Sequence, residues 1–199
     1  MINYIDEDKN IHGGNTHKTC AGELFQGLTS NDIFPIHKSY EPIKDISQIP
    51  ELVETPLVSA VEKLFQKKIK TIDTSANTDK IWIQIYYDVL NPTNRGIAEK
   101  IGGTFSLSGW SGGRPIICFA LPPIKSTPVK YIEDWGNWIA DSFQKQDFVV
   151  IKKSWTLAEM AKFRRIPGST EAKILEDMKP ILMTRSINYN PQTKIFTTI

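Results

Sequence analysis

Long hydrophobic runs are missing from this sequence of 199 residues. A membrane-spanning helix needs about 20 consecutive apolar residues, and the longest apolar stretches, at 81–90 and 115–121, are too short or interrupted. The first ten residues include Asp6, Glu7 and Asp8, where a secretory signal would have basic and then apolar residues. We therefore expect no membrane partner, and a location in the cytoplasm or export without a cleaved Sec signal peptide.

Cysteine is scarce, and so is net charge of either sign. Cys20 and Cys118 are the only cysteines, so no disulfide framework can form. The 24 basic and 22 acidic residues leave a net charge of +2, which by itself does not indicate a polyanionic partner. Neither glycine-rich phosphate-binding pattern, G-x-G-x-x-G or G-x-x-x-x-G-K-[S/T], occurs in the chain. We expect a soluble globular protein without a cofactor.

Helical and strand-like patterns are mixed along the chain without a regular β-α-β alternation. After Thr55-Pro56, apolar residues recur every three or four positions, which indicates a helix. An alternation of period two at 81–90 indicates a strand. Similar patterns predict helices at 21–28, 56–68, 93–101, from 128 to about 143, 156–165 and 169–179, and strands at 104–108, 115–121, 148–151, 181–187 and 194–199. We predict an α+β fold with a mixed or mostly antiparallel sheet, about four to six helices, and a C-terminal αα-hairpin followed by a β-hairpin.

Composition changes from one end of the chain to the other. Residues 1–50 are rich in glycine, proline and short polar side chains, which predicts a loop-rich segment. Residues 1–150 have 15 basic and 18 acidic side chains, whereas residues 151–199 have 9 and 4. We predict a single domain, 1–199, that includes a candidate basic C-terminal subdomain at 128–199.

Residues 109–113, GWSGG, match the G-x-S-x-G pattern of serine hydrolases. In α/β-hydrolases this pattern opens a helix, and the catalytic histidine comes later in the chain. Here a strand is predicted after the pattern, and His12, His17 and His37 all precede Ser111. We interpret the segment as the glycine-rich loop of a hairpin.

His12, His17 and Cys20 form the only cluster of metal-ligand residue types in the sequence. They would supply three of the ligands of a zinc ion, although the second cysteine pair of a structural zinc site is missing. Alternatively, Cys20 could be the nucleophile of a thiol-dependent hydrolase or transferase, with His17 or His37 as its base. The simplest interpretation is that these are ordinary loop residues, so no metal is favoured.

Short polar side chains gather at 73–77, which we predict to be a loop after a short strand. Ligand sites favour such loops, so Asp73, Ser75 and Asn77 are candidate ligand-binding residues, together with the guanidinium of Arg95. The simpler interpretation is that these side chains turn and cap the backbone.

The run 157–178, LAEMAKFRRIPGSTEAKILEDM, is similar in spacing to bacterial helix-turn-helix segments. It departs from them at two positions, with Arg165 in place of the usual turn glycine and Glu171 in place of a buried aliphatic residue. A helix at 131–145, the strand at 148–151 and the terminal hairpin would complete a winged-helix order. However, the second helix has three acidic residues against two lysines, which opposes contact with phosphates. An αα-hairpin packed on a sheet is the simpler interpretation.

No catalytic arrangement satisfies both its residue types and its structural context, so we expect a non-enzymatic protein that binds a macromolecular partner. Another protein is the first candidate partner, because Trp135 and Trp138 lie in an apolar stripe that predicts core or, where exposed, a docking surface. Nucleic acid is the second candidate. The candidate partner-binding residues are the cations at the start of the basic region, Lys152, Lys153, Lys162, Arg164 and Arg165.

Overall fold

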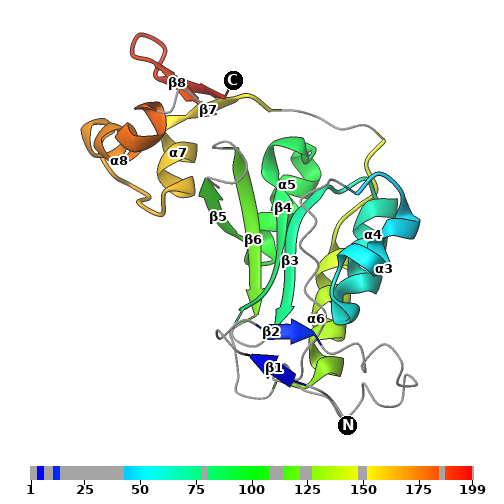
Figure 1. Cartoon of the computed structure of the whole chain (residues 1–199). Helices are drawn as coiled ribbons and strands as arrows, with labels where there is room; N and C mark the ends of the chain where they lie inside the picture. The colour runs from blue at the N-terminus through cyan, green and yellow to red at the C-terminus, as the bar shows by residue number, and fades with distance from the viewer. Residues whose placement is uncertain are drawn as a thin grey trace. The chain divides into compact units, whose positions relative to one another are not determined.

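The computed structural model describes part of the chain in full and two short N-terminal strands as backbone (Figure 1). The two strands, β1 (Tyr4–Asp6) and β2 (Ile11–Gly13), pair antiparallel. The fully described ranges are 43–77, 80–107, 114–121, 127–147, 152–183 and 187–198, apart from the side chains of 77 and 80. The helix predicted at 21–28, the strand predicted at 148–151 and the G-x-S-x-G segment lie outside the described residues.

Helices and antiparallel sheets confirm the predicted α+β class. The described helices are α3 (Ile49–Leu52), α4 (Val58–Gln66), α5 (Pro92–Lys100), α6 (Val129–Ser142), α7 (Leu157–Phe163) and α8 (Glu171–Met183), with short 3-10 turns η1 (Ile46–Gln48), η2 (Thr55–Leu57) and η3 (Tyr87–Val89). The strands are β3 (Thr71–Asn77), β4 (Lys80–Tyr86), β5 (Thr104–Leu107), β6 (Pro115–Leu121), β7 (Ser154–Thr156), β8 (Ile187–Asn190) and β9 (Ile195–Thr198). They form one sheet in the order β3-β4-β6-β5 and another in the order β7-β9-β8. Within the described ranges, no helix has the length and apolar character needed to cross a bilayer.

Three predicted segments have a different structure from the one expected. The strand predicted at 81–90 ends at Tyr86 and is followed by the 3-10 turn η3. The polar run 73–77 belongs to strand β3 and is not a loop, because β3 pairs with β4 and this pairing overrides the turn preference of its short polar residues. The C-terminal strand predicted from 181 begins only at Ile187, because α8 continues to Met183. Pro180 stays within that helix, where it removes one backbone donor but does not end the helix.

The chain divides into two compact units. The first unit contains residues 1–84 and 119–146, and the second contains residues 85–118 and 147–199.

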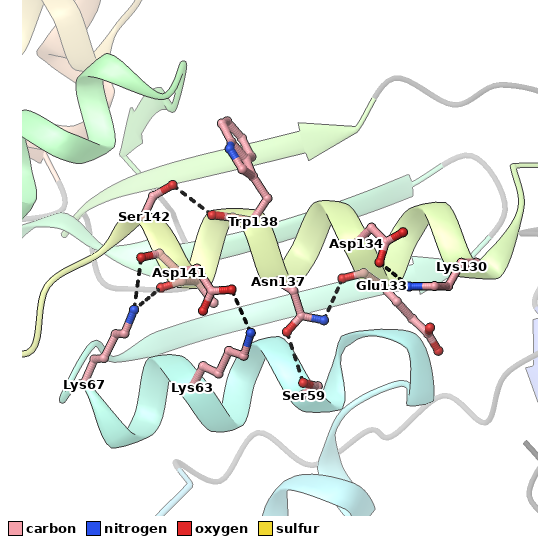
Figure 2. Close-up of polar contacts among 11 residues, drawn as sticks. Ser59, Lys63, Lys67, Lys130, Glu133, Asp134, Asn137, Trp138, Asp141 and Ser142 are labelled. Carbon is pink, nitrogen blue, oxygen red and sulfur yellow. Dashed lines mark hydrogen bonds and ion pairs between the residues drawn. The ribbon is translucent and has the colours of Figure 1, made fainter.

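In the first unit, helices α4 and α6 lie side by side (Figure 2). A side chain at Gly136 of α6 would bring its Cβ within 3.0 Å of Leu57 Cδ2, so glycine permits this close approach. The Lys67 ammonium donates hydrogen bonds to the carbonyl oxygens of Ala140, at 2.8 Å, and Asp141, at 3.2 Å. Because these carbonyls belong to the last turn of α6, the lysine stabilises the negative end of that helix.

The apolar stripe predicted on α6 is only partly buried. Ile132, Ile139 and Phe143 are buried, whereas the Trp138 side chain is 53% exposed and projects away from α4 (Figure 2). The buried face follows Ile132 through Gly136 and Ile139 to Phe143, and Trp138 lies outside that stripe on the helix surface.

The second unit is built on aromatic residues from separate elements. Tyr87, Phe105, Trp155 and Phe163 contact one another with ring centroids 5.1–6.0 Å apart. They come from η3, β5, β7 and α7, and all four side chains are buried. Aromatic pairs at such distances contribute beyond the area that they bury, so this cluster anchors α7 to the rest of the unit.

Candidate nucleic-acid interface

The last part of the second unit has the element order β7, α7, α8, β8, β9, which we call the C-terminal module (residues 152–183 and 187–198). Strand β9 lies in the middle of its sheet and pairs antiparallel with both β7 and β8. Trp155 of β7 and Tyr189 of β8 both lie opposite Phe196 of β9. The strand before the helix pair and the hairpin after it therefore form one sheet.

Helix α7 begins at a capping box formed by Thr156 and Glu159. The Glu159 amide donates to Thr156 Oγ1 at 3.2 Å, and the Thr156 amide donates to Glu159 Oε2 at 2.9 Å. These bonds satisfy amides that have no partner inside the helix. The strand before α7 lies at Ser154–Thr156, directly against the capping residue.

The turn between α7 and α8 has a left-handed backbone conformation that glycine favours. The Ile166 amide donates to the Ala161 carbonyl at 2.8 Å, and the Arg165 amide donates to the Lys162 carbonyl at 3.0 Å. This is a Schellman motif, and its central residue, Arg165, has φ +60°. The departure noted in the sequence therefore changes the residue and keeps the left-handed backbone.

Replacing Arg165 with glycine is expected to stabilise the protein by about 0.5–1 kcal/mol, because glycine adopts positive φ without the steric cost that an L-residue has. Urea denaturation of both proteins measures the difference. Lys100→Gly in the last turn of α5, where the backbone is helical, is the control and should lower stability by about 1 kcal/mol. A lower stability for Arg165→Gly would contradict the strain that we assign to this turn.

Two of the three acidic residues of α8 are neutralised by cations of the same module. Glu171 forms an ion pair with Lys194, at 2.7 Å between Oε2 and Nζ, and accepts a hydrogen bond from the Tyr189 hydroxyl. The hydrogen bonds from Lys194 and Tyr189 lower the pKa of Glu171, so it is charged at neutral pH. Asp177 forms an ion pair with Arg164. Among the described residues, Glu176 is therefore the acidic residue of α8 that has no ion pair.

The exposed side chains of α8 follow a helical spacing and define one surface, which we call the outer face of α8. Ile174 and Met178 are buried on the opposite side of the helix. In the part of the chain that the structure describes, the outer-face residues Lys173, Glu176 and Lys179 form no ion pair. The outer face consists of Ala172, Lys173, Glu176, Lys179, Pro180 and Met183. A count of charges over the whole helix does not separate this face, although the spacing 172, 173, 176, 179, 180 and 183 marks it in the sequence.

The five predicted partner-binding cations have different environments. Lys152 pairs with Glu159 and lies 4.9 Å from the Trp155 ring centroid. Lys162 pairs with Glu99 at 2.8 Å and lies 4.1 Å from the Phe105 ring centroid. These contacts, like the Arg164–Asp177 pair, hold the cations within the second unit. Lys153 and Arg165 are exposed and have no ion pair with any described residue.

The four predicted ligand-binding residues belong to different units of the chain. Asp73 and Ser75 alternate along β3, which places them on one face of the strand, and the side chain of Asn77 lies outside the described residues. The Asp73 carboxylate accepts a hydrogen bond from the Trp82 indole at 2.7 Å. Arg95 lies on α5 in the second unit, with its guanidinium 5.6 Å from the Tyr87 ring centroid and donating to the Tyr87 carbonyl at 3.4 Å.

The predicted thiol and metal residues are beyond the reach of the described structure. Cys20, His17 and His37 lie outside the described residues, and His12 is described only as backbone within β2. Among the residues that are described, no group of three His, Cys, Asp or Glu side chains could hold a metal ion. The thiol-enzyme and metal hypotheses therefore stay predictions.

No family model, no curated protein and no solved structure matches the chain. The strand order, the helix pair and the outer face of α8 are therefore interpreted from this molecule itself.

Proposed function

We propose that the protein is a non-enzymatic nucleic-acid-binding protein that contacts duplex DNA through its C-terminal module. The observation that carries this proposal is the outer face of α8, which is exposed along the second helix of a helix pair flanked by a three-stranded sheet. An α-helix presented in this way fits the major groove of B-DNA.

The charges of the module support the same proposal. The outer face has two lysines and one glutamate. The other acidic residues of α8, Glu171 and Asp177, form ion pairs with Lys194 and Arg164. Lys153 and Arg165 add two exposed cations in the same module. Cations that are not neutralised within the protein can replace the counterions of DNA phosphates, which provides most of the free energy of non-specific binding.

The test is the salt dependence of binding to a labelled duplex of about 20 base pairs, measured by fluorescence anisotropy from ~50 to ~200 mM salt. We expect the logarithm of the association constant to fall linearly with the logarithm of the salt concentration. Lys179→Gln should weaken binding to all sequences and make the slope shallower by about 0.9, the loss of one phosphate contact.

Lys100→Gln is the matched control, because it removes the same charge from an exposed lysine of the same unit outside the module. It should leave both the affinity and the slope unchanged. Absence of binding at ~50 mM salt would reject the proposal, and so would an equal loss of affinity in both variants.

A protein partner is the second candidate, favoured by one observation in the first unit. Tyr131 and Trp138 of α6 are 50% and 53% exposed and lie seven residues apart, on the same side of the helix. Exposed aromatic side chains of this kind anchor protein interfaces. The DNA assay separates the two candidates, because Trp138→Ser should not change the affinity for DNA if the C-terminal module is the binding site.

A further inference from the structure

The first turns of α8 combine three exposed side chains of different chemistry. Ala172 is apolar, Lys173 is a hydrogen-bond donor and Glu176 is an acceptor, and all three lie on the outer face of α8. The acids on either side, Glu171 and Asp177, are already bonded to Lys194 and Arg164. Glu176 is therefore the acidic group of this helix that remains available for a ligand in the described structure.

A carboxylate on a surface that contacts only phosphates would weaken binding, since it repels them. Base edges differ from phosphates in this respect. In the major groove, cytosine presents an amino group that donates to a carboxylate, and guanine presents two acceptors, O6 and N7, that suit a lysine. The combination of Lys173 and Glu176, separated by three residues on one helical face, matches the donor and acceptor pattern of G·C base pairs.

We propose that α8 reads base sequence, with Glu176 accepting a hydrogen bond from a cytosine amino group and Lys173 donating to guanine in a neighbouring part of the site. This inference rests on the proposed function, because it assigns specificity to the same surface. Lys179, further along the helix, contacts phosphate and contributes affinity without sequence preference. Glu176 costs affinity for DNA in general and gains it at sites with cytosine in the right position.

The experiment is a selection from a random duplex library with the full-length protein, followed by affinity measurements on the selected site. The wild type should select a site that contains G·C pairs at fixed positions. Glu176→Gln should change the preference at one position from cytosine to adenine, by about tenfold or more, because a glutamine amide pairs with the N6 and N7 atoms of adenine. By the same pairing, Lys173→Gln should change the preference at a different position from guanine to adenine.

The control is Glu51→Gln, a change of the same type at an exposed residue of the first unit, and it should select the wild-type site. A change of preference confined to single positions supports base reading by α8. Binding without any selected site, or a selected site that Glu176→Gln and Lys173→Gln leave unaltered, overturns base reading while the DNA-binding proposal stands. Absence of binding in the anisotropy assay rejects both.

Discussion

Replacing Arg114 with methionine is expected to destabilise the protein by about 3 kcal/mol or more, because it leaves a buried carboxylate without its partner. The Arg114 guanidinium donates to both carboxylate oxygens of Asp88, at 2.7 and 2.8 Å. The Asp88 side chain is 4% exposed, whereas that of Arg114 is 32% exposed and lies 4.0 Å from the Tyr86 ring centroid. The two partners therefore differ in how well water can replace the interaction.

This difference makes the two single variants unequal. In Asp88→Asn the arginine can turn to solvent, so we expect a loss of about 2 kcal/mol, smaller than in Arg114→Met. The double variant should be more stable than the sum of the single losses predicts, because neither charge is then left alone. Urea denaturation of the four proteins gives the coupling energy. Lys130→Met, which breaks an exposed ion pair with Asp134, is the control and should cause no measurable change. Equal losses in the two single variants would contradict the assignment.

Replacing Glu54 with glutamine is expected to stabilise the protein at pH 8 by about 2–3 kcal/mol, and to have little effect near pH 4.5. Glu54 is 7% exposed, and its Oε2 accepts a hydrogen bond from the Thr74 hydroxyl at 3.4 Å. Burial, with a smaller contribution from the nearby charge of Asp73, raises the pKa of Glu54 from 4.5 to about 7. Both effects act against the ionised form.

The direction of the pH dependence follows from proton binding. Between pH 4.5 and about 7 the folded protein holds a proton on Glu54 that the unfolded chain has released. The contribution of this group to stability is therefore complete below pH 4.5 and is lost as the pH rises through about 7. Above that range the charged carboxylate has to be buried at constant cost. Glutamine has nearly the same shape and no charge, so it avoids this loss.

The measurement is the difference in unfolding free energy between the wild type and Glu54→Gln at several pH values, since other titrating groups cancel in that difference. Glu51→Gln is the matched control, because Glu51 is an exposed glutamate of α3 in the same unit. This exposed substitution should change the unfolding free energy by no more than about 0.5 kcal/mol. A Glu54→Gln difference that is constant from pH 4.5 to 8 would show that Glu54 titrates as an ordinary exposed glutamate.

The elements predicted correctly are those that neighbouring residues specify. Thr156 and Glu159 are three positions apart, and their capping box forms as the sequence indicates. The end of α5 is likewise local, because Gly102 directly follows the helix predicted at 93–101 and adopts φ +85°. The same Schellman geometry follows α4 and α7, where Lys68 and Arg165 have φ +58° and +60°. Neither of these two turns has a glycine at its left-handed position. A rule that looks for glycine in the sequence therefore finds only the turn after α5.

The sequence does not show which of the predicted site residues form ion pairs in the folded protein. The basic residues at 152–165 are visible as a cluster of charge, but whether each one is available depends on carboxylates elsewhere in the chain. Lys162 is paired with Glu99, and Arg164 with Asp177. The charge of the outer face of α8 could not be predicted for the same reason. Glu171 and Asp177 count as acidic in the sequence, but ion pairs neutralise them in the folded protein.

By itself, the sequence determined the α+β class, most of the helices and the two hairpins of the described chain, because amphipathic spacing and capping act over a few residues. The sequence also fixes the low net charge and the two cysteines, and any function must be compatible with both. Only the tertiary structure decided that 73–77 is a strand, that Trp138 is exposed, and that Arg114 pairs with Asp88. These outcomes depend on strand pairing, burial and ion pairs between residues that are far apart in the chain. The free energy of each such interaction is set by its environment in the folded protein, which neighbouring residues in the sequence do not specify.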